Sequence, residues 1–464
     1  MELEFYGAAG EVTGSCHIVR VADHQVLLDC GLIQGGRRDE NRNRDDFPFE
    51  PSSIDAVILS HAHLDHSGRL PLLVRGGFNG PIYAQNATRD LVRVLLLDAA
   101  DIAERDTEKE NRRRERKGLE AVEPLYTRDD ALAAWKLIRG LPYRQDQQVV
   151  AGLLAQFHDA GHILGSAAVV LQLRQGGDDR KLVFSGDLGQ YGAPILNDPE
   201  DIGPADIVLM ESTYGGRVHR SREDTIAEIG EIISDAHHEH GNILIPAFAI
   251  GRSQEVLYTL GKNYDDWSLG DWHVFLDSPM AIDASHIYWD YPHLYDKEAT
   301  KLRQKINEMP KLANLHLTST PAESQVINRL TNGAIVIAGS GMCNGGRILH
   351  HLKHNIWRKQ CQIVIVGYQA KGSLGRRLVE GAQHIRIHGE TLRVAAQIHT
   401  VGGLSAHGDE NDLARWYGNL TNSPPVYLVH GEPRAAQALK KKLGTDCRAD
   451  VNIAEPGMKV DLLA

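Results

Sequence analysis

The stretch ILSHAHLDHSG at positions 58–68 constrains the fold of this chain more than any other feature. It places His61, His63, Asp65 and His66 directly after an apolar run, where we expect a strand to end. Residues two apart on an extended segment share a face, so His61 and His63 can reach one metal ion. Asp65 and His66 follow where we expect a helix to begin, and they can reach a second ion. Such a pair of ions, about 3.5–4 Å apart, serves the hydrolysis of phosphodiesters and other esters.

Other potential ligands also follow short apolar runs. His162 lies in a glycine-bounded loop between two expected strands, and Asp187 and His430 each come just after one. Asp29 ends another strand, and we interpret it as an outer carboxylate that orients the ligand loop. Taken singly, each of these residues could be a structural polar group. Together they gather at carboxyl ends of strands, where open α/β layers place their sites.

The composition excludes several classes of protein. The chain has 464 residues, which predicts two domains. It has no apolar run of about 18 residues, and its start lacks a basic region followed by an apolar stretch, so we expect neither a membrane span nor a signal peptide. Its five cysteines are scattered and never form C-x-x-C, which indicates reduced thiols of a cytoplasmic protein. Any metal must therefore be held by histidine and carboxylate. The formal charge of −11 argues against a general nucleic-acid coat but not against a nuclease with a metal-lined cleft.

The pattern of apolar residues predicts an α/β fold in which one domain is inserted into another. We expect strands before about residue 60, a helix over 88–116, and further strands at 149–158, 167–173 and 181–184. From about Ser212, helices (224–240, 253–264) alternate with short strands (242–246, 274–277, 333–338, 362–366), as in a parallel sheet. The predicted boundaries are 1–211 for the first part of the outer domain, 212–392 for the inserted domain and 393–464 for the last part.

At this level of detail the chain resembles a known family. HAHLDH with Asp29, His162 and Asp187 is similar to the metallo-β-lactamase superfamily. The further stretches ESTYGGR, PAFAIGRSQE, LDSPMA, AGSGMCNGGR, LSAHGD and LVHGE resemble its β-CASP branch of RNA-processing nucleases, which includes the pre-mRNA 3′-end cleavage endonuclease. The likeness covers nearly the whole chain. It implies a four-layer αβ/βα sandwich with a di-metal site, commonly zinc, and an inserted α/β β-CASP domain that caps the cleft.

The resemblance also implies a division of labour among the ligands. His61, His63 and His162 would hold one metal, and Asp65, His66 and His430 the other, with Asp187 bridging both. Glu211 matches the first distinctive acid of the branch and His407 its distinctive histidine. We expect two zinc ions per chain, with manganese as the alternative metal.

These residue types fit phosphodiester hydrolysis. A zinc-bound water titrates near neutrality, so a metal-bridging hydroxide would be the nucleophile, with Asp65 placed to orient it or take its proton. The departing 3′-oxygen needs a proton, and His407 is suited to give one as general acid. Glu211 beside His407 would orient it and raise its pKa. The alternative for His407 is a helix-capping or core histidine.

The inserted segment offers candidates for contact with RNA. Glycine-rich turns after a strand let backbone N–H groups approach a phosphate, although such turns are also routine connections. Basic side chains there would position the RNA backbone, although each alone is an ordinary surface charge. The predicted RNA-binding residues are Arg252, Gly341, Gly345, Arg347, Lys371, Arg376 and Ser405.

We therefore expect a cytoplasmic ribonuclease that hydrolyses single-stranded RNA internally and leaves 3′-hydroxyl and 5′-phosphate ends. Cleavage that runs from the 5′ end stays open. A sibling hydrolase of the superfamily, such as a β-lactamase or a thioester hydrolase, needs no insertion of this length. A nuclease that processes DNA ends is a closer rival. A non-catalytic RNA-binding subunit would have lost metal ligands, and this chain keeps all of them.

The family also sets expectations about additional modules and partners. The metal-domain pattern starts at residue 1, and the chain ends shortly after His430. It therefore resembles the minimal bacterial form, without RNA-binding modules ahead of the core and without the C-terminal domain of the RNase J type. We expect no membrane partner. A homodimer is compatible with the family type, and no signature in the sequence indicates one.

Overall fold

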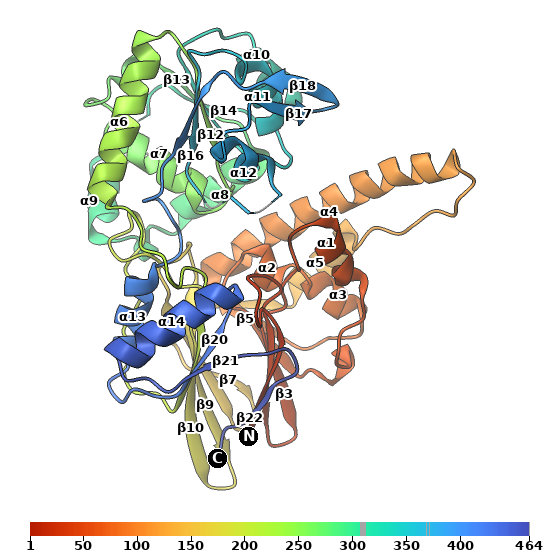
Figure 1. The fold of residues 1–464 in the computed structure, drawn as a ribbon. Coiled ribbons are helices and arrows are strands. Elements are labelled where there is room, and N and C mark those ends of the chain that lie inside the picture. Colours follow the sequence, from red (N-terminus) through yellow and green to blue (C-terminus); the bar gives the residue numbers. More distant parts are fainter. Residues whose placement is uncertain (307–311, 368, 371, 464) are drawn as a thin grey trace. The chain divides into compact units, whose positions relative to one another are not determined.

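The computed structural model describes residues 1–306, 312–367, 369–370 and 372–463. The described chain divides into two compact units. Unit 1 comprises residues 1–191, 198–218 and 407–464, and unit 2 comprises residues 192–197 and 219–406. Figure 1 labels many of the helices and strands of each unit. No helix within the described residues is long and apolar enough to cross a membrane.

Unit 1 contains two seven-stranded sheets. The strand order of the first sheet is β22-β1-β2-β3-β4-β5-β6, and that of the second is β21-β20-β11-β10-β9-β8-β7. The strands of the first sheet are β1 (Glu2–Gly7), β2 (Cys16–Val21), β3 (His24–Leu28), β4 (Ala56–Ile58), β5 (Ile82–Gln85), β6 (Ile138–Leu141) and β22 (Lys459–Asp461). Those of the second are β7 (Gln147–Val150), β8 (Leu153–Asp159), β9 (Ala167–Gln175), β10 (Asp178–Phe184), β11 (Ile207–Glu211), β20 (Val426–Val429) and β21 (Val451–Ile453).

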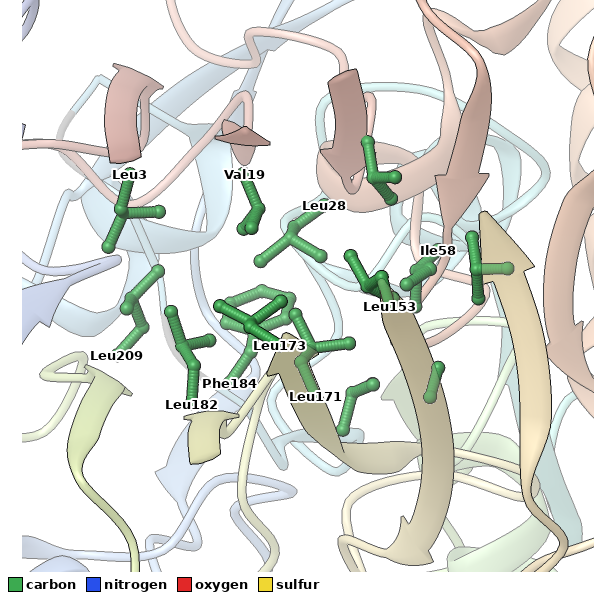
Figure 2. Packing of buried hydrophobic residues seen from close by; sticks show 14 of the residues in the cluster. Leu3, Val19, Leu28, Ile58, Leu153, Leu171, Leu173, Leu182, Phe184 and Leu209 are labelled. Carbon is green, nitrogen blue, oxygen red and sulfur yellow. The ribbon is translucent and has the colours of Figure 1, made fainter. Parts of the chain in front are cut away.

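The core of unit 1 lies between these two sheets. Leu3 and Leu28 of the first sheet pack in one buried cluster with Leu171 and Phe184 of the second (Figure 2). Successive residues of a strand point to opposite faces, so β9 supplies alternate residues to this cluster and Val170 to a second one. That second cluster covers the outer face of the second sheet. The two apolar faces of the sheet therefore account for a layered sandwich.

Helices cover the outer faces of both sheets. The helices of unit 1 are α1 (Arg37–Asn41), α2 (Leu64–Ser67), α3 (Leu70–Arg75), α4 (Asn86–Glu115), α5 (Arg128–Lys136), α13 (Glu410–Gly418) and α14 (Pro433–Asp446). Helix α4 contacts β5 and β6 of the first sheet, and α5 packs on α4. Trp416 of α13 and Leu439 of α14 join the cluster on the second sheet. The result is the expected four-layer αβ/βα sandwich.

Unit 2 is built on a six-stranded sheet whose neighbouring strands are all parallel. Its strand order is β14-β13-β15-β12-β16-β19. These strands are β12 (Ile243–Pro246), β13 (His273–Leu276), β14 (Leu315–Leu317), β15 (Ala334–Ala338), β16 (Gln362–Ile365) and β19 (Gln397–Thr400). Strands β17 (His384–Ile387) and β18 (Glu390–Arg393) form a separate hairpin.

Both faces of this parallel sheet are buried. Ile243 and Ile245 of β12 face a cluster with α6 and α7, whereas Leu244 faces a cluster with α11 and α12. The helices of unit 2 are α6 (Arg222–His238), α7 (Arg252–Lys262), α8 (Pro279–Asp290), α9 (Lys297–Ile306), α10 (Pro321–Ile327), α11 (Ile348–Asn355) and α12 (Leu374–Val379). A sheet with helices on both faces is the α/β layer that the alternating pattern predicts.

The structure differs from the expected elements and boundaries in several places. The stretch 149–158, which we expected as one strand, is the hairpin of β7 and β8, which turns at Ala151 and Gly152. Residues 192–197, which we assigned to the outer domain, belong to unit 2, and residues 212–218, which we assigned to the inserted domain, belong to unit 1. Strand β19 pairs with β16, so residues 393–406, which we assigned to the last part of the outer domain, also belong to unit 2. The sequence did not indicate this because β19 is a short, half-exposed strand whose partner lies in the inserted sheet.

Candidate metal centre

The loop after β4 brings the first candidate ligands together. His61 follows β4 after two residues and His63 after four, and Asp65 and His66 lie on α2, the short helix that begins next. Asp29 holds the start of this loop, because its Oδ1 accepts a hydrogen bond from the backbone N–H of Ser60 at 2.8 Å. The loop also packs against the backbone at Gly31. A Cβ at Gly31 would stand 1.6 Å from the carbonyl oxygen of Asp65, so only glycine fits at this position.

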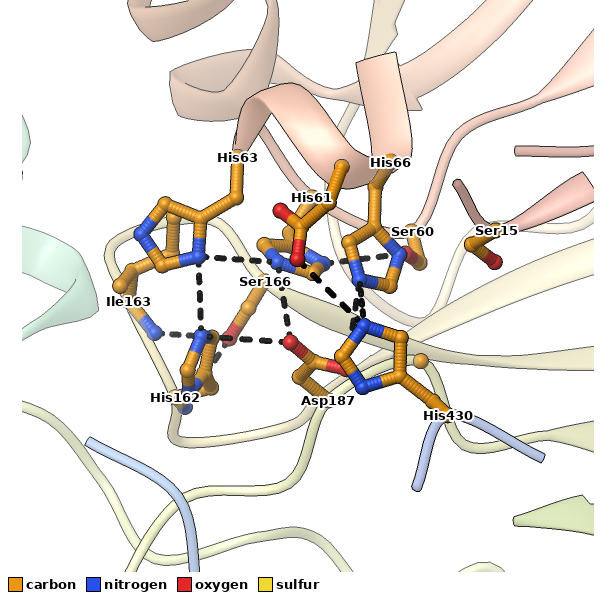
Figure 3. A network of polar contacts seen from close by, with 12 residues as sticks. Ser15, Ser60, His61, His63, His66, His162, Ile163, Ser166, Asp187 and His430 are labelled. Atoms are coloured by element: carbon orange, nitrogen blue, oxygen red, sulfur yellow. Dashed lines mark hydrogen bonds and ion pairs between the residues drawn. The ribbon is translucent and has the colours of Figure 1, made fainter. Parts of the chain in front are cut away.

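His162 joins His61 and His63 in a first group of ligand atoms (Figure 3). Nδ1 of His63 lies 3.2 Å from Nε2 of His61 and 3.1 Å from Nε2 of His162. The loop of His162 is fixed by Ser166, whose hydroxyl accepts hydrogen bonds from the backbone N–H groups of His162 and Ile163. Three ring nitrogens from two distant loops therefore converge on one point.

Asp65, His66 and His430 form a second group. Nε2 of His66 lies 3.1 Å from Nε2 of His430, and this nitrogen of His430 lies 3.4 Å from Oδ2 of Asp65. His430 comes directly after β20, and its backbone N–H donates to the carbonyl of Ala8 at 2.6 Å. The ligands of the second group thus come from α2 and from the carboxyl end of a strand in the other sheet.

Asp187 lies between the two groups. Its Oδ2 is 3.4 Å from Nε2 of His61 and 3.6 Å from Nε2 of His162. Its Oδ1 is 3.4 Å from Nε2 of His66, is buried, and accepts no hydrogen bond from any described residue. Each oxygen of one carboxylate therefore faces one group.

The spacing of these atoms fits two metal ions. Ligand atoms about 2.0–2.1 Å from a tetrahedral zinc lie about 3.3 Å from one another, and the nitrogens of both groups are spaced in this way. Burial lowers the pKa of His61 well below its usual value and that of His63 to about 4, so both rings keep the lone pairs that a metal needs. The buried carboxylates supply matching negative charge. The donor set therefore fits a pair of zinc ions.

The charged groups of the centre support one another without a metal. Burial opposes the charged form of Asp187, but His430, His66 and His61 outweigh it and hold the pKa of Asp187 well below its usual range. Burial likewise disfavours the imidazolium of His66, whereas Asp187 and Asp29 raise its pKa well above the usual value. A metal ion held here would supply the positive charge that the proton of His66 supplies to these carboxylates, and its binding would release that proton.

Asp29 orients His66 from outside the ligand set. Its Oδ2 lies 2.6 Å from Nδ1 of His66 and accepts hydrogen bonds from the hydroxyls of Ser60 at 2.9 Å and Ser15 at 3.1 Å. A carboxylate on one ring nitrogen leaves the other nitrogen as the donor to a metal. Asp29 and His430 both adopt left-handed backbone angles, with φ of +58° and +49°. Such strain in non-glycine residues concentrates at functional sites.

The sequence did not single out the hydroxyl partners of the centre. Ser15 and Ser60 bind Asp29, and the hydroxyl of Thr213 lies 3.2 Å from Nδ1 of His430. Of these three residues, only Ser60 could have been suspected from the sequence, because it directly precedes His61. Ser15 and Thr213 are distant from their partners in the sequence, and hydroxyl residues are too common for their type to indicate this role.

His407 and Glu211 lie beside the first group. Nδ1 of His407 is 3.4 Å from Oε1 of Glu211 and 3.9 Å from Oδ2 of Asp187. Glu211 ends β11, is fully buried, and accepts a hydrogen bond from the backbone N–H of Leu188 at 2.6 Å. Burial disfavours the imidazolium of His407, but the carboxylates of Glu211, Asp187 and Asp65 outweigh this and raise its pKa to about 9.

The residues that we expected to contact RNA and that the structure describes belong to unit 2, and Lys371 lies outside the described residues. Arg252 is 6% exposed and forms an ion pair with Glu255. Arg347 donates to Oδ1 of Asp277 at 2.6 Å and to two backbone carbonyls. Both guanidinium groups are therefore engaged inside the unit, and their contact with RNA stays a prediction.

Gly341 and Gly345 lie in the loop between β15 and α11, as expected. The hydroxyl of Ser340 accepts hydrogen bonds from the backbone N–H groups of Asn344 and Gly345, so the loop closes on itself. Arg376, in the first turn of α12, is paired with Glu380 at 2.6 Å. Ser405 follows β19. RNA contact at these positions also stays a prediction.

Comparison with known families agrees with this geometry. The metallo-beta-lactamase superfamily matches residues 9–227, and the Beta-Casp domain matches residues 253–378. A third family, described as the Zn-dependent metallo-hydrolase RNA specificity domain, matches residues 391–453. These three families follow one another along nearly the whole chain.

Individual relatives match over similar lengths. Ribonuclease TTHA0252 of Thermus thermophilus is 40% identical over 443 residues, which is 96% of each chain. Transcription termination factor FttA of Methanocaldococcus jannaschii is 33% identical over 446 residues, 93% of this chain and 67% of that one. A crystal structure of a protein of unknown function from Enterococcus faecalis V583 has a TM-score of 0.55 at 14% identity, with 99% of both chains covered, and shows a shared fold. The chain belongs to the β-CASP branch of the metallo-β-lactamase superfamily and is a metal-dependent nuclease.

Proposed function

We propose that this protein is a ribonuclease that hydrolyses phosphodiester bonds within single-stranded RNA and leaves 3′-hydroxyl and 5′-phosphate ends. The observation that carries the proposal is the position of Asp187 between two groups of metal ligands, with His407 next to it. The name of the Thermus thermophilus relative, a ribonuclease, supports RNA as the substrate. The match to a family described as an RNA specificity domain supports it as well.

His61, His63 and His162 would hold one zinc ion, and Asp65, His66 and His430 the other, with one oxygen of Asp187 toward each. When bound, the two ions supply a water of lowered pKa and favourable charge for the phosphate oxygens. The histidines and Asp187 would fix that pair of charges in a buried, rigid frame, so the reacting phosphate meets them without reorganisation of the chain.

Asp65 is the base in this proposal. Burial disfavours its charged form, but His430 and His66 outweigh burial and lower its pKa, so the carboxylate is ionised at neutral pH. It can orient the attacking water by accepting a hydrogen bond and can take the proton as the new P–O bond forms. Replacing it would remove a ligand and the base together.

His407 is the general acid. Its raised pKa keeps the ring protonated at neutral pH, and Glu211 holds Nδ1, so the proton on Nε2 is the one that we assign to the departing 3′-oxygen. Backbone contacts fix the ring: residue 407 forms a bridge with Gly189, and the N–H of Gly408 donates to the carbonyl of Leu188. This ties the acid to the segment that carries Asp187.

The test uses body-labelled single-stranded RNA with a blocked 5′ end, incubated with the purified protein beside DNA of the same sequence. The proposal predicts internal cuts in RNA alone, with 3′-hydroxyl ends that accept ligation. Cleavage of DNA ends would favour the DNA-processing alternative. RNA that is cut only after its 5′ end is freed would contradict internal cleavage. Intact RNA and DNA with zinc present would contradict the ribonuclease proposal.

A further inference from the structure

Phe248 is an aromatic residue held at the carboxyl edge of the unit 2 sheet with 41% of its surface exposed. It lies two residues after β12, the strand between β15 and β16 in the sheet order. Among the described Phe, Tyr and Trp residues, only Phe248 and Trp357 are exposed to this degree. Open parallel sheets bind ligands at this edge, beyond the carboxyl ends of their strands.

Glycines from both neighbouring strands border the ring. A Cβ at Gly341, in the loop after β15, would stand 2.9 Å from Cδ2 of Phe248 and 3.0 Å from Cε2. A Cβ at Gly367, in the loop after β16, would stand 3.8 Å from Cε2. The side-chain amide of Gln369 donates to the carbonyls of Gly341 at 2.9 Å and Gly367 at 3.1 Å, which joins the two loops. Because residue 341 is glycine, the loop leaves room for the ring of Phe248. A side chain at position 341 would displace the ring.

The backbone that carries the ring is fixed independently of the ring. The N–H of Ala247 donates to the carbonyl of Ala338 at 3.1 Å. The carbonyl of Phe248 accepts from the hydroxyl of Ser253 at 2.7 Å and from its backbone N–H at 3.2 Å. Much of this ring faces water, so it lacks part of the stabilisation that burial gives an aromatic side chain. A ligand that covers the ring would recover it.

The loop beside the ring is closed by several internal hydrogen bonds. They run from Ser340 N–H to the Gly345 carbonyl at 3.1 Å and from Ile348 N–H to the Gly339 carbonyl at 3.0 Å. Two further N–H groups of the loop donate to the hydroxyl of Ser340. These bonds set the position of the loop against which the ring lies, and the exposed ring presents an apolar face at this edge.

We propose that Phe248 stacks on one nucleobase of the single-stranded RNA substrate. This inference rests on the proposed function and extends it to substrate binding in unit 2. Every base has an aromatic face, so stacking on a fixed ring holds a single strand with little preference for sequence. A paired base is already stacked on its neighbours, so such a contact favours unpaired RNA.

The test measures the affinity of the zinc-loaded chain for a fluorescent dodecaribonucleotide by anisotropy, in a His407→Ala background that limits cleavage. Phe248→Ala is compared with Phe248→Trp, which keeps an aromatic face, and with Trp357→Ala, which removes the other exposed aromatic ring. Each variant is also measured against a series of RNAs that lack one base at successive positions. Thermal melting of each variant checks that the fold is retained.

We expect Phe248→Ala to weaken binding about tenfold and the other two variants to stay within about twofold of the parent. One abasic position should weaken binding to the parent and have no further effect in Phe248→Ala. Equal affinities for Phe248→Ala and Trp357→Ala would overturn the inference, as would a loss that no abasic position reproduces. RNA that binds neither parent nor variants would overturn the ribonuclease proposal as well, whereas parent binding with no effect of Phe248 would leave that proposal standing.

Discussion

The two oxygens of Asp187 face different partners: Oδ2 lies 3.4 Å from Nε2 of His61, and Oδ1 lies 3.4 Å from Nε2 of His66. One side chain thereby joins ligands that come from the loop after β4 and from α2. Because a single carboxylate serves both groups, the two positions should not fill or empty independently.

Replacing Asp187 tests this coupling. Asp187→Ala should lower the zinc content from about two ions per chain to less than one and abolish cleavage, because both groups lose the same ligand. Elemental analysis of the dialysed protein measures the content. Asp178→Ala, an exposed change at the start of β10, is the control and should retain both metal and activity. One ion retained at full occupancy in Asp187→Ala would contradict a shared ligand.

Replacing His407 should separate chemistry from metal binding. His407→Ala should keep its zinc and lower the cleavage rate about 100- to 10,000-fold, the usual contribution of a general acid. Single-turnover cleavage and metal analysis of the same sample provide the measurement. Normal turnover in this variant would contradict the assignment of His407 as the acid.

The pH profile tests the pairing of His407 with Glu211. The pKa of His407 is raised to about 9, so the acid is present at neutral pH and the rate should fall as the pH rises through about 9. Glu211→Gln removes the first carboxylate that raises this pKa, so the falling limb should move to lower pH. A limb that stays in place in Glu211→Gln would show that this carboxylate does not set the titration.

Asp29 should act on metal affinity through His66. Asp29→Asn keeps the size of the side chain but removes the charge 2.6 Å from Nδ1 of His66, which we expect to weaken zinc binding about 10- to 100-fold. Competition with a zinc chelator measures the affinity. Asp23→Asn, an exposed change in the turn between β2 and β3, serves as the control. Unchanged zinc affinity in Asp29→Asn would mean that Asp29 supports the fold and does not act on metal binding.

Asp277 is predicted to stabilise unit 2 through a buried network. It accepts hydrogen bonds from Arg347, His351, Thr318 and Ser324, each at 2.6 Å. Burial opposes its charge, but these four partners outweigh burial and lower its pKa to about 2. A carboxyl group with a lowered pKa contributes its stability above about pH 4 and loses it as the pH falls toward 2.

Asp277→Asn should therefore lower the free energy of unfolding by about 2 kcal/mol or more near neutral pH, with a smaller difference from the parent toward pH 2. Urea unfolding at several pH values measures both effects. Asp266→Asn, at an exposed position of the same unit, should change little. A difference that does not depend on pH would contradict a stabilising charge at Asp277.

The grouping of the candidate metal ligands could be predicted from the sequence because these residues follow short apolar strands. His61, Asp187 and His430 each come within three residues of a strand end, and strand ends of layered α/β folds meet at one edge. The outer-shell hydroxyls could not be predicted in this way. Ser15 reaches Asp29 from another strand connection, and only the folded sheet brings them within 3.1 Å.

Substrate contacts were harder to predict for a related reason. An arginine in a family motif looks available in the sequence, yet Arg347 is engaged by Asp277, 70 positions earlier in the chain. Phe248 lies in the stretch PAFAIGRSQE, where the sequence does not indicate its exposure, because an isolated phenylalanine after a buried strand usually belongs to the core. Its exposure depends on glycines in two neighbouring loops, which pattern alone does not relate to it.

The most direct test of the two-metal centre is anomalous diffraction at the zinc absorption edge from crystals of the zinc-loaded protein. We expect two peaks about 3.5–4 Å apart, one on each side of the Asp187 carboxylate. The first should lie among His61, His63 and His162, and the second among Asp65, His66 and His430. A single peak, or two peaks that do not share Asp187, would contradict this arrangement.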